Sequence, residues 1–232
     1  MLWQFGDENA AFFGLPVISP DQTLAAVGIW TEPGSEQPNR VAILDAETGE
    51  LERELEYPRC FSAEPFGWSA DGSRFLTAAG IEPCERPEAP GGVWVEVYDT
   101  DTWQSISVIE SQDPWVAHPV FDDDGQLYVF GVDSPLTVYD AVSYQPIKTI
   151  EEAYGLGDVT ADGTLVTAFT NTRDLGLGLI DTASEVRVDN LTPLVGRPGQ
   201  PWGARFSPDG SKLLVATDAT ELVAWETVGG RQ

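Results

Sequence analysis

Apolar and polar residues alternate along most of the chain in short runs, and turn-forming residues separate these runs. The stretch "GARFSPDGSKLLVAT" shows the pattern best, with an alternating run, a turn at Asp209 and a second apolar run. Period-two alternation on both sides of a tight turn is typical of a β-hairpin. Helical periodicity over a dozen residues occurs nowhere in the sequence. The pattern therefore predicts an all-β chain.

This hairpin recurs through the whole sequence. Its aspartate has counterparts at steps of 50, 53, 38 and 47 residues, at Asp21, Asp71, Asp124, Asp162 and Asp209. A second apolar run follows each hairpin and, in the first four repeats, ends in an aspartate with Thr or Ser three residues later. These pairs are Asp45 and Thr48, Asp99 and Thr102, Asp140 and Ser143, and Asp181 and Ser184. Each repeat is thus predicted to form four strands, a to d, with tight a-b and c-d turns.

A four-stranded sheet with two apolar faces cannot bury them alone, so the repeats must pack against one another. Radial packing of such sheets gives a β-propeller. We predict a single β-propeller domain over 1–232 with five four-stranded antiparallel blades. The blades span roughly 14–57, 64–111, 116–151, 156–192 and 202–228, and an N-terminal strand at 1–5 completes the last blade. The competing interpretation is that these five blades belong to a larger ring.

The repeats resemble those of a known family. "FSPDG" followed by "LLVAT", and Trp225 directly before Glu226 in "LVAWET", resemble a blade of a WD-repeat-like bacterial or archaeal β-propeller. Two features of WD repeats are weak here. The tryptophan occurs once, and the Gly-His pair between strands d and a is missing, since the single histidine, His118, lies elsewhere. The resemblance implies a rigid platform for protein partners.

The charge of the chain bears on its partners. Thirty-eight acidic residues against 12 Lys and Arg give a net charge of −26, so a nucleic acid would be repelled. A hydrophobic fraction of 42% indicates a folded chain despite this charge. A solvated acidic surface is the favoured explanation, and a basic protein partner or bound cations is the alternative.

The sequence also bears on compartment. No run approaches the roughly 18 apolar residues of a membrane span, so no membrane insertion is expected. The start, "MLWQFGDEN", lacks the regions of a signal peptide, which suits a cytoplasmic protein or one domain of a larger protein. Cys60 and Cys84 fall in loops at the same end of the second blade, where a disulfide is sterically plausible. That disulfide would place the protein outside the cytoplasm or at the cell surface, and free thiols in a cytoplasmic protein are the alternative.

Few residues suggest chemistry. His118 has no identifiable Ser or Cys partner, so a structural or surface role is favoured. The acidic run Asp122, Asp123 and Asp124 lacks the alternating spacing of a Ca²⁺ loop and occupies a predicted hairpin turn. We therefore expect no metal, no cofactor and no catalytic residue. The alternative is a hydrolase or small-ligand binder of lactonase or glycosidase type, with Asp or Glu residues at the mouth of the central channel.

The two ends of the predicted ring differ. The tight a-b and c-d turns gather aspartates at one end, whereas the longer, Pro-rich b-c and d-a loops gather arginines, including Arg40, and aromatic residues at the other. Variable loops on a rigid scaffold commonly carry binding, and Trp, Tyr and Arg dominate interface energies. We therefore predict a protein-binding face at the long-loop end, formed by Trp115, Trp202, Tyr154, Phe61, Arg59, Arg86, Arg173 and Arg197.

Overall fold

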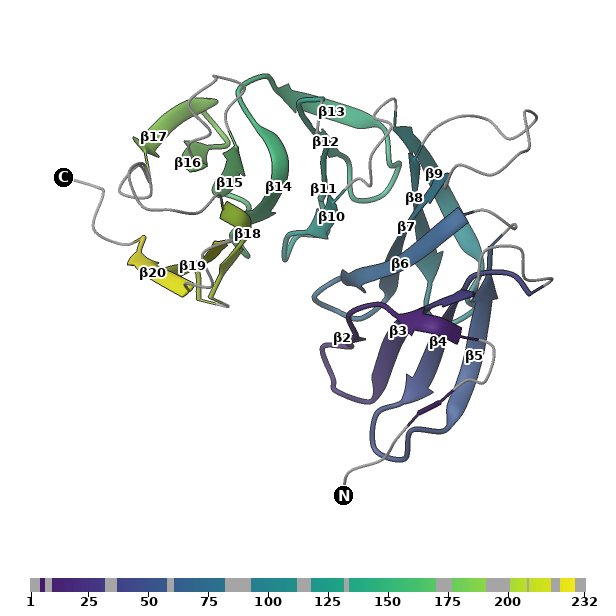
Figure 1. The fold of residues 1–232 in the computed structure, drawn as a ribbon. Coiled ribbons are helices and arrows are strands. Elements are labelled where there is room, and N and C mark those ends of the chain that lie inside the picture. The colour runs from purple at the N-terminus through teal and green to yellow at the C-terminus, as the bar shows by residue number, and fades with distance from the viewer. Residues whose placement is uncertain are drawn as a thin grey trace. The chain divides into compact units, whose positions relative to one another are not determined.

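The computed structural model contains only β-strands in the part of the chain that it describes (Figure 1). The described residues are 5–6, 10–31, 37–57, 61–81, 93–111, 118–131, 134–169, 177–190, 201–207, 209–217 and 222–227. The chain divides into two compact units, 1–119 and 120–232, and each is described by itself.

The first sheet of the first unit has the order β1-β3-β4-β5, and β2 also pairs with β3. Its first strand is split, because Phe13 of β1 pairs with Ile29 and Val17 of β2 pairs with Ala26 on the same side of β3. The sheet therefore begins upstream of the boundary predicted at residue 14. Its strands are β1 (Ala10–Phe13), β2 (Val17–Ile18), β3 (Leu24–Thr31), β4 (Arg40–Asp45) and β5 (Leu51–Glu56).

The second sheet has the order β6-β7-β8-β9 and packs against the first. Ala26, Val41 and Ile43 of the first sheet form one buried cluster with Phe75 and Tyr98 of the second. Burying a large apolar side chain contributes about 1.5–3 kcal/mol, so this contact between sheets is a main source of stability. The strands are β6 (Phe61–Trp68), β7 (Arg74–Ile81), β8 (Val93–Asp99) and β9 (Ser105–Ser111).

The second unit stacks its sheets in the same way. One cluster joins Leu136 and Val138 to Val166 and Ile180 of the next sheet, and another joins Leu177 and Leu179 to the sheet after that. The third and fourth sheets have four strands, and the last has three in its described part. The strands are β10 (His118–Phe121), β11 (Leu127–Phe130), β12 (Leu136–Tyr139) and β13 (Pro146–Ile150); β14 (Tyr154–Val159), β15 (Leu165–Phe169), β16 (Leu177–Asp181) and β17 (Val186–Asn190); and β18 (Pro201–Phe206), β19 (Lys212–Thr217) and β20 (Leu222–Glu226).

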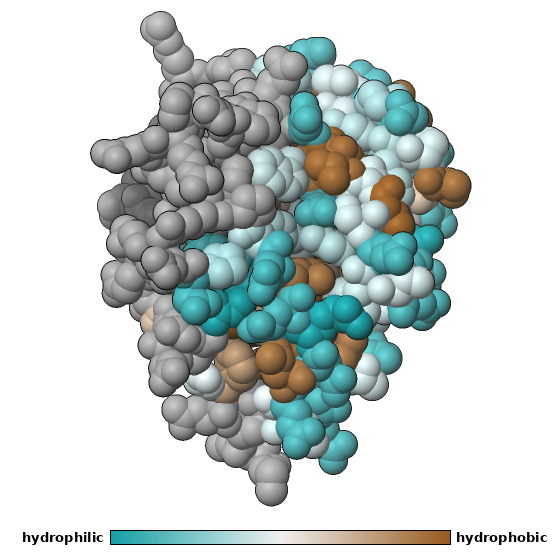
Figure 2. Space-filling view, turned by 90° about the vertical axis from the view of Figure 1, so that its right-hand side faces the viewer, coloured by the Kyte–Doolittle hydropathy of each residue, from teal (hydrophilic) through white to brown (hydrophobic). Residues whose placement is uncertain are grey.

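Burial varies across the first four sheets. Their second and third strands are largely buried, as in β11, which is buried throughout, whereas β20 of the last sheet has no buried residue. The fourth strands are mostly exposed, as in β5 and β13. Their exposed apolar residues include Val108 and Val186, and Figure 2 shows apolar residues in small groups among hydrophilic ones. Isolated exposed apolar residues are ordinary for a folded protein and mark no site by themselves.

The predicted completion of the last sheet by residues 1–5 stays a prediction. Residues 1–4 lie outside the described part of the chain, and Phe5 packs against a cluster of the first sheet that includes Val27 and Leu44. The prediction of one domain over 1–232 is likewise not tested. The all-β class and the four-stranded antiparallel sheets are confirmed.

Candidate functional site

The a-b turns are closed by one repeated arrangement, which we call the Asp clamp. In the second sheet, Asp71 Oδ1 accepts hydrogen bonds from the Ser69 hydroxyl at 2.6 Å, the Ser73 N–H at 3.0 Å and the Ser73 hydroxyl at 2.8 Å. The Ser69 hydroxyl also accepts the N–H of Arg74 at 3.0 Å. A carboxylate that bonds nearby backbone and hydroxyl groups in this way stabilises a tight turn.

The clamp recurs with the same spacing in three other sheets. Its central residues there are Asp21, flanked by Ser19 and Thr23, Asp162, flanked by Thr160 and Thr164, and Asp209, flanked by Ser207 and Ser211. Hydrogen bonds from the flanking hydroxyls hold the pKa of each aspartate below its usual value, down to about 2 for Asp209. These four carboxylates are therefore ionised at neutral pH and already engaged by their own turns.

The third sheet departs from the clamp. The backbone hydrogen bond that closes its turn runs from Asp122 N–H to Gln126 O, four residues on, whereas Ser69 N–H in the second sheet bonds Arg74 O, five residues on. Asp122 stands where the other turns carry Ser or Thr, and its Oδ1 accepts the N–H of Gln126 at 2.8 Å. The Tyr128 hydroxyl donates to Asp122 Oδ2 at 3.3 Å. Burial raises the pKa of Asp122. The prediction that "FDDDG" forms a turn is correct. Asp124 precedes the turn glycine as Asp71 does, but the carboxylate that accepts a backbone N–H in this turn is that of Asp122.

The c-d turns are closed by a second arrangement. Asp45 Oδ1 accepts the N–H of Thr48 at 2.7 Å and its hydroxyl at 2.9 Å, and the predicted pairs in the next three sheets do the same. A threonine then links the two turns of one sheet. Thr100 Oγ1 donates to Gly72 O at 2.7 Å, and Thr182 Oγ1 donates to Gly163 O at 2.6 Å. The ends of the sheets that carry these turns, called the tight-turn end below, are thereby held rigid.

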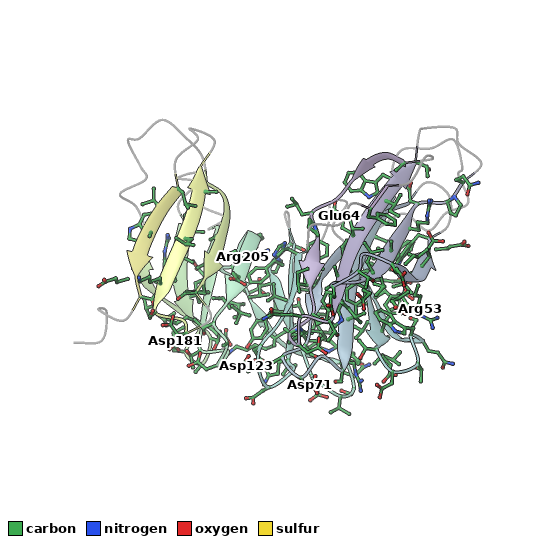
Figure 3. All side chains as sticks on the ribbon, turned by 90° about the horizontal axis from the view of Figure 1, so that it is seen from below. Arg53, Glu64, Asp71, Asp123, Asp181 and Arg205 are labelled. Atoms are coloured by element: carbon green, nitrogen blue, oxygen red, sulfur yellow. The ribbon has the colours of Figure 1, made fainter. Side chains whose placement is uncertain are left out.

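A cleft of about 490 Å³ opens at the tight-turn end of the first unit. It lies between the a-b turn of the first sheet and both tight turns of the second. Its lining includes three acidic residues, Asp21, Asp71 and Asp101, and one aromatic residue, Trp68. Figure 3 shows Asp71 at this end of its sheet. The other lining residues are Ser19, Pro20, Thr23, Leu24, Ala70, Gly72 and Thr100.

Ionisable groups also occur on the first strands of the sheets. Glu64 lies in β6 within the first unit, and burial raises its pKa (Figure 3). Asp158 lies in β14, where its Oδ2 accepts the N–H of Phe206 from the next sheet at 2.8 Å. Burial raises the pKa of Asp158, and the charge of Arg205 partly offsets this effect. Asp158 thus links two neighbouring sheets.

Sequence reasoning missed a buried hydroxyl network in the first unit. The Tyr57 hydroxyl lies 2.6 Å from Thr77 Oγ1 and 3.1 Å from the Tyr98 hydroxyl. Tyr57 follows the last strand of the first sheet, and the other two residues belong to the second. Burial raises the pKa of both tyrosines. The sequence signal for this network was Tyr98, which directly precedes Asp99 as Trp225 precedes Glu226 in "LVAWET".

Most of the predicted binding residues fall outside the described part of the chain. These are Arg59, Arg86, Trp115, Arg173 and Arg197, together with Cys60 and Cys84. The backbones of Phe61 and Trp202 lie in the first strands of their sheets, at the opposite end from the tight turns. Tyr154 begins β14 at the same end of its own sheet and is half-buried.

Two other candidates have structural contacts. Arg40, predicted as a loop arginine, is buried and its Nε pairs with Glu54 Oε1 at 2.9 Å, so it is not an exposed binding residue. His118 lies edge-to-face against Phe66, with ring centroids 5.1 Å apart. Within the described residues, no three His, Cys, Asp or Glu side chains are grouped as metal ligands would be. In that same part of the chain no helix is long and apolar enough to cross a membrane.

Comparisons with known proteins identify the fold. No protein-family model and no curated protein matches the sequence. Among solved structures, the β-propeller domain of Myceliophteria thermophila Cps50 (Swd1) matches with a TM-score of 0.70 and 14% identity, over 97% of this chain and 67% of that one. Kuenenia stuttgartiensis hydrazine synthase matches with a TM-score of 0.65 and 19% identity, over 93% and 63%.

The chain thus spans about two thirds of the length of each of these two structures. The predicted fold class, an all-β propeller of four-stranded antiparallel blades, is confirmed. Identities this low show the fold alone. Membership of a bacterial or archaeal WD-repeat family remains a prediction from the sequence.

Proposed function

We propose that this chain is a propeller scaffold that binds a protein partner at the end of its sheets opposite the tight turns. We call this end the long-connection end. The proposal rests on one observation. Every a-b turn spans five residues, whereas the connections at the other end include 32–39, 82–92, 170–176 and 191–200.

The chemistry of the two ends supports this assignment. At the tight-turn end, four carboxylates accept hydrogen bonds from hydroxyl groups of their own turns and thereby hold the same turn geometry in each sheet. At the long-connection end, the sequence varies in length from sheet to sheet and supplies Trp115, Trp202 and four arginines. A rigid frame that carries variable connections is a common basis of recognition, and large aromatic residues with Arg dominate interface energies.

The experiment is partner capture with matched variants. Trp115→Ala combined with Trp202→Ala should remove partners that the unaltered chain retains from its source, with little change in the thermal unfolding temperature. The control is Val142→Ala combined with Asp123→Asn, two exposed residues of tight turns in the third sheet. The proposal fails if the tryptophan variant retains the same partners, or if the control loses them equally.

A second candidate, a hydrolase or small-ligand binder, is favoured by Glu64. Burial raises the pKa of this carboxyl, and groups with perturbed pKa values are frequent in active sites. Glu64 lies on a first strand, as channel-lining residues of a propeller do. If this candidate is right, the unaltered chain should hydrolyse a lactone or glycoside, and the Glu64→Gln variant should have lost that activity. Absence of such hydrolysis in the unaltered chain would eliminate it.

A further inference from the structure

We propose that the cleft between the tight turns of the first two sheets binds an arginine side chain presented by a basic segment of a protein partner. This site lies at the opposite ends of the sheets from the long-connection end and does not depend on the function proposed for that end. Three features of the cleft support this assignment, namely its aromatic residue, its charge and its size.

Trp68 forms the aromatic wall. It is the last residue of β6, pairs with Phe75 in the backbone register and packs against the Phe75 ring, with centroids 4.6 Å apart. Trp68 is half-buried, and it both contacts Phe75 in the core and lines the cleft. The other sheets carry Ile18, Phe121, Val159 or Phe206 at this position, so the repeat does not require tryptophan here.

The carboxylates supply the opposite charge. The Asp clamps fix the side chains of Asp21 and Asp71 before any ligand arrives, so little conformational freedom is lost on binding. Asp101 is exposed in the middle of the c-d turn, where Asp99 and not Asp101 holds the backbone. Among the described residues, no Lys, Arg or His lines the cleft. The lining residues thus carry negative charge only. Arg74, whose charge also acts on Asp71, is paired with Asp99 at 3.0 Å.

Guanidinium suits this combination of groups. Its plane stacks on an indole face while its N–H groups donate to carboxylates in a fork geometry. The cleft, at about 490 Å³, falls within the range of roughly 300–1,000 Å³ that is usual for ligand sites. A phosphate or carboxylate ligand would be repelled by the three aspartates.

The test is an NMR titration of the ¹⁵N-labelled chain at low ionic strength. The probes are end-capped Gly-Arg-Gly and the same peptide with neutral citrulline, with CaCl₂ as a separate arm. We expect saturable shifts of the Trp68 indole N–H, assigned with Trp68→Phe, from the arginine peptide alone. Added salt should weaken the binding, because the charged groups are partly exposed.

Matched variants separate this cleft from the general negative charge. Asp101→Asn should weaken peptide binding about two- to five-fold, the effect of an exposed ion pair. Trp68→Leu should weaken it by a similar factor through loss of the cation–π contact. Asp123→Asn changes the net charge equally at an exposed position of the third sheet and should leave binding unchanged.

Four results would overturn the proposal. These are equal shifts with the citrulline peptide, no movement of the Trp68 indole signal, equal losses for Asp101→Asn and Asp123→Asn, or saturable binding of Ca²⁺ without binding of the arginine peptide. Asp101→Asn alters an exposed turn residue, so it remains informative if Trp68→Leu fails to fold.

Discussion

The hydroxyl of Ser69 donates a 2.6 Å hydrogen bond to the carboxylate of Asp71, two residues further along the chain. The same relationship holds between Ser19 and Asp21, 2.7 Å apart, in the first sheet. The most regular feature of the sequence is therefore a device that closes a hairpin. The carboxylates of the clamp are hydrogen-bonded within their own turns, so the repeated residues serve the fold. We expect partner recognition where the repeat varies in length or where one sheet departs from its pattern.

Removing the hydroxyl of the clamp should destabilise the fold. Ser69→Ala removes a buried group that accepts the Arg74 N–H and donates to Asp71, so we expect a loss of about 1–2 kcal/mol in the free energy of unfolding. Urea denaturation measures this loss. Ser105→Ala, at an exposed position that begins β9, is the control and should change stability little. Equal effects of the two variants would refute a structural role for the clamp.

The clamps also predict a dependence on acid. Hydrogen bonds lower the pKa of Asp71 from 3.8 to about 2, so its contribution to stability is present above about pH 4 and is lost as pH falls toward 2. Asp71→Asn should therefore be less stable at neutral pH and show a shallower loss of stability between these values. Asp123→Asn, flanked by residues without hydroxyls, should retain the steep loss. Thermal unfolding from pH 5 to pH 2 would show the difference.

Burial of other carboxyls acts in the opposite direction. The pKa of Asp122 and that of Asp158 are raised in the folded chain, so their protonation favours folding as pH falls through the raised values. These groups moderate the acid loss from the clamps. The unfolding temperatures of Asp71→Asn and Asp123→Asn are therefore compared with each other at each pH, because both variants keep Asp122 and Asp158.

The tyrosine network should contribute measurably to stability. Tyr57→Phe leaves the fully buried Thr77 hydroxyl without its 2.6 Å partner, and we expect a cost of about 1–3 kcal/mol in unfolding free energy. Adding Thr77→Val should cost less than the sum of the two single changes, because the groups are coupled. Tyr139→Phe, at a half-buried tyrosine, is the matched control. Additive effects in the double variant would contradict the network.

The cysteine prediction can be examined by mass. Phe61 and Ile81 are register partners at the ends of β6 and β7. In the sequence, Cys60 directly precedes Phe61, and Cys84 comes three residues after Ile81. Backbone proximity at this point is compatible with a disulfide. Alkylation without reductant should leave the intact mass unchanged, and alkylation after reduction should add two labels. Two labels without reductant would show free thiols and remove the argument for an oxidising compartment.

The sequence predicted those parts of the fold that repeat. Asp21, Asp71, Asp162 and Asp209 could be aligned because one turn geometry demands one pattern of hydroxyls. The hydrogen bond from Thr100 to Gly72 was not predicted. The signal for it is an acidic residue followed by threonine, which recurs at Thr182 and Thr227. The clamp was predictable because its hydrogen bonds are local and fix the spacing, whereas the Thr100 bond joins residues 28 apart and shows only as a recurring dipeptide.

Features that depend on contacts distant in the sequence could not be predicted. Tyr57 and Tyr98 meet only because two sheets stack, and no periodicity connects them. The split first strand, in which β1 and β2 both pair with β3, has no counterpart in the described parts of the other sheets and so no signal in the repeat. The cleft beside Trp68 likewise requires the turns of two sheets to be brought together.

Site-specific photo-crosslinking tests the central claim most directly, because it reports which end of a sheet a partner touches. A photoreactive phenylalanine analogue would replace Tyr154 or Trp202 at the long-connection end, and Val142 or Ala183 at exposed tight turns, in the chain expressed in its source. The account predicts covalent adducts with the same partner from Tyr154 and Trp202 and none from Val142 or Ala183. Adducts from the tight-turn positions alone would contradict it.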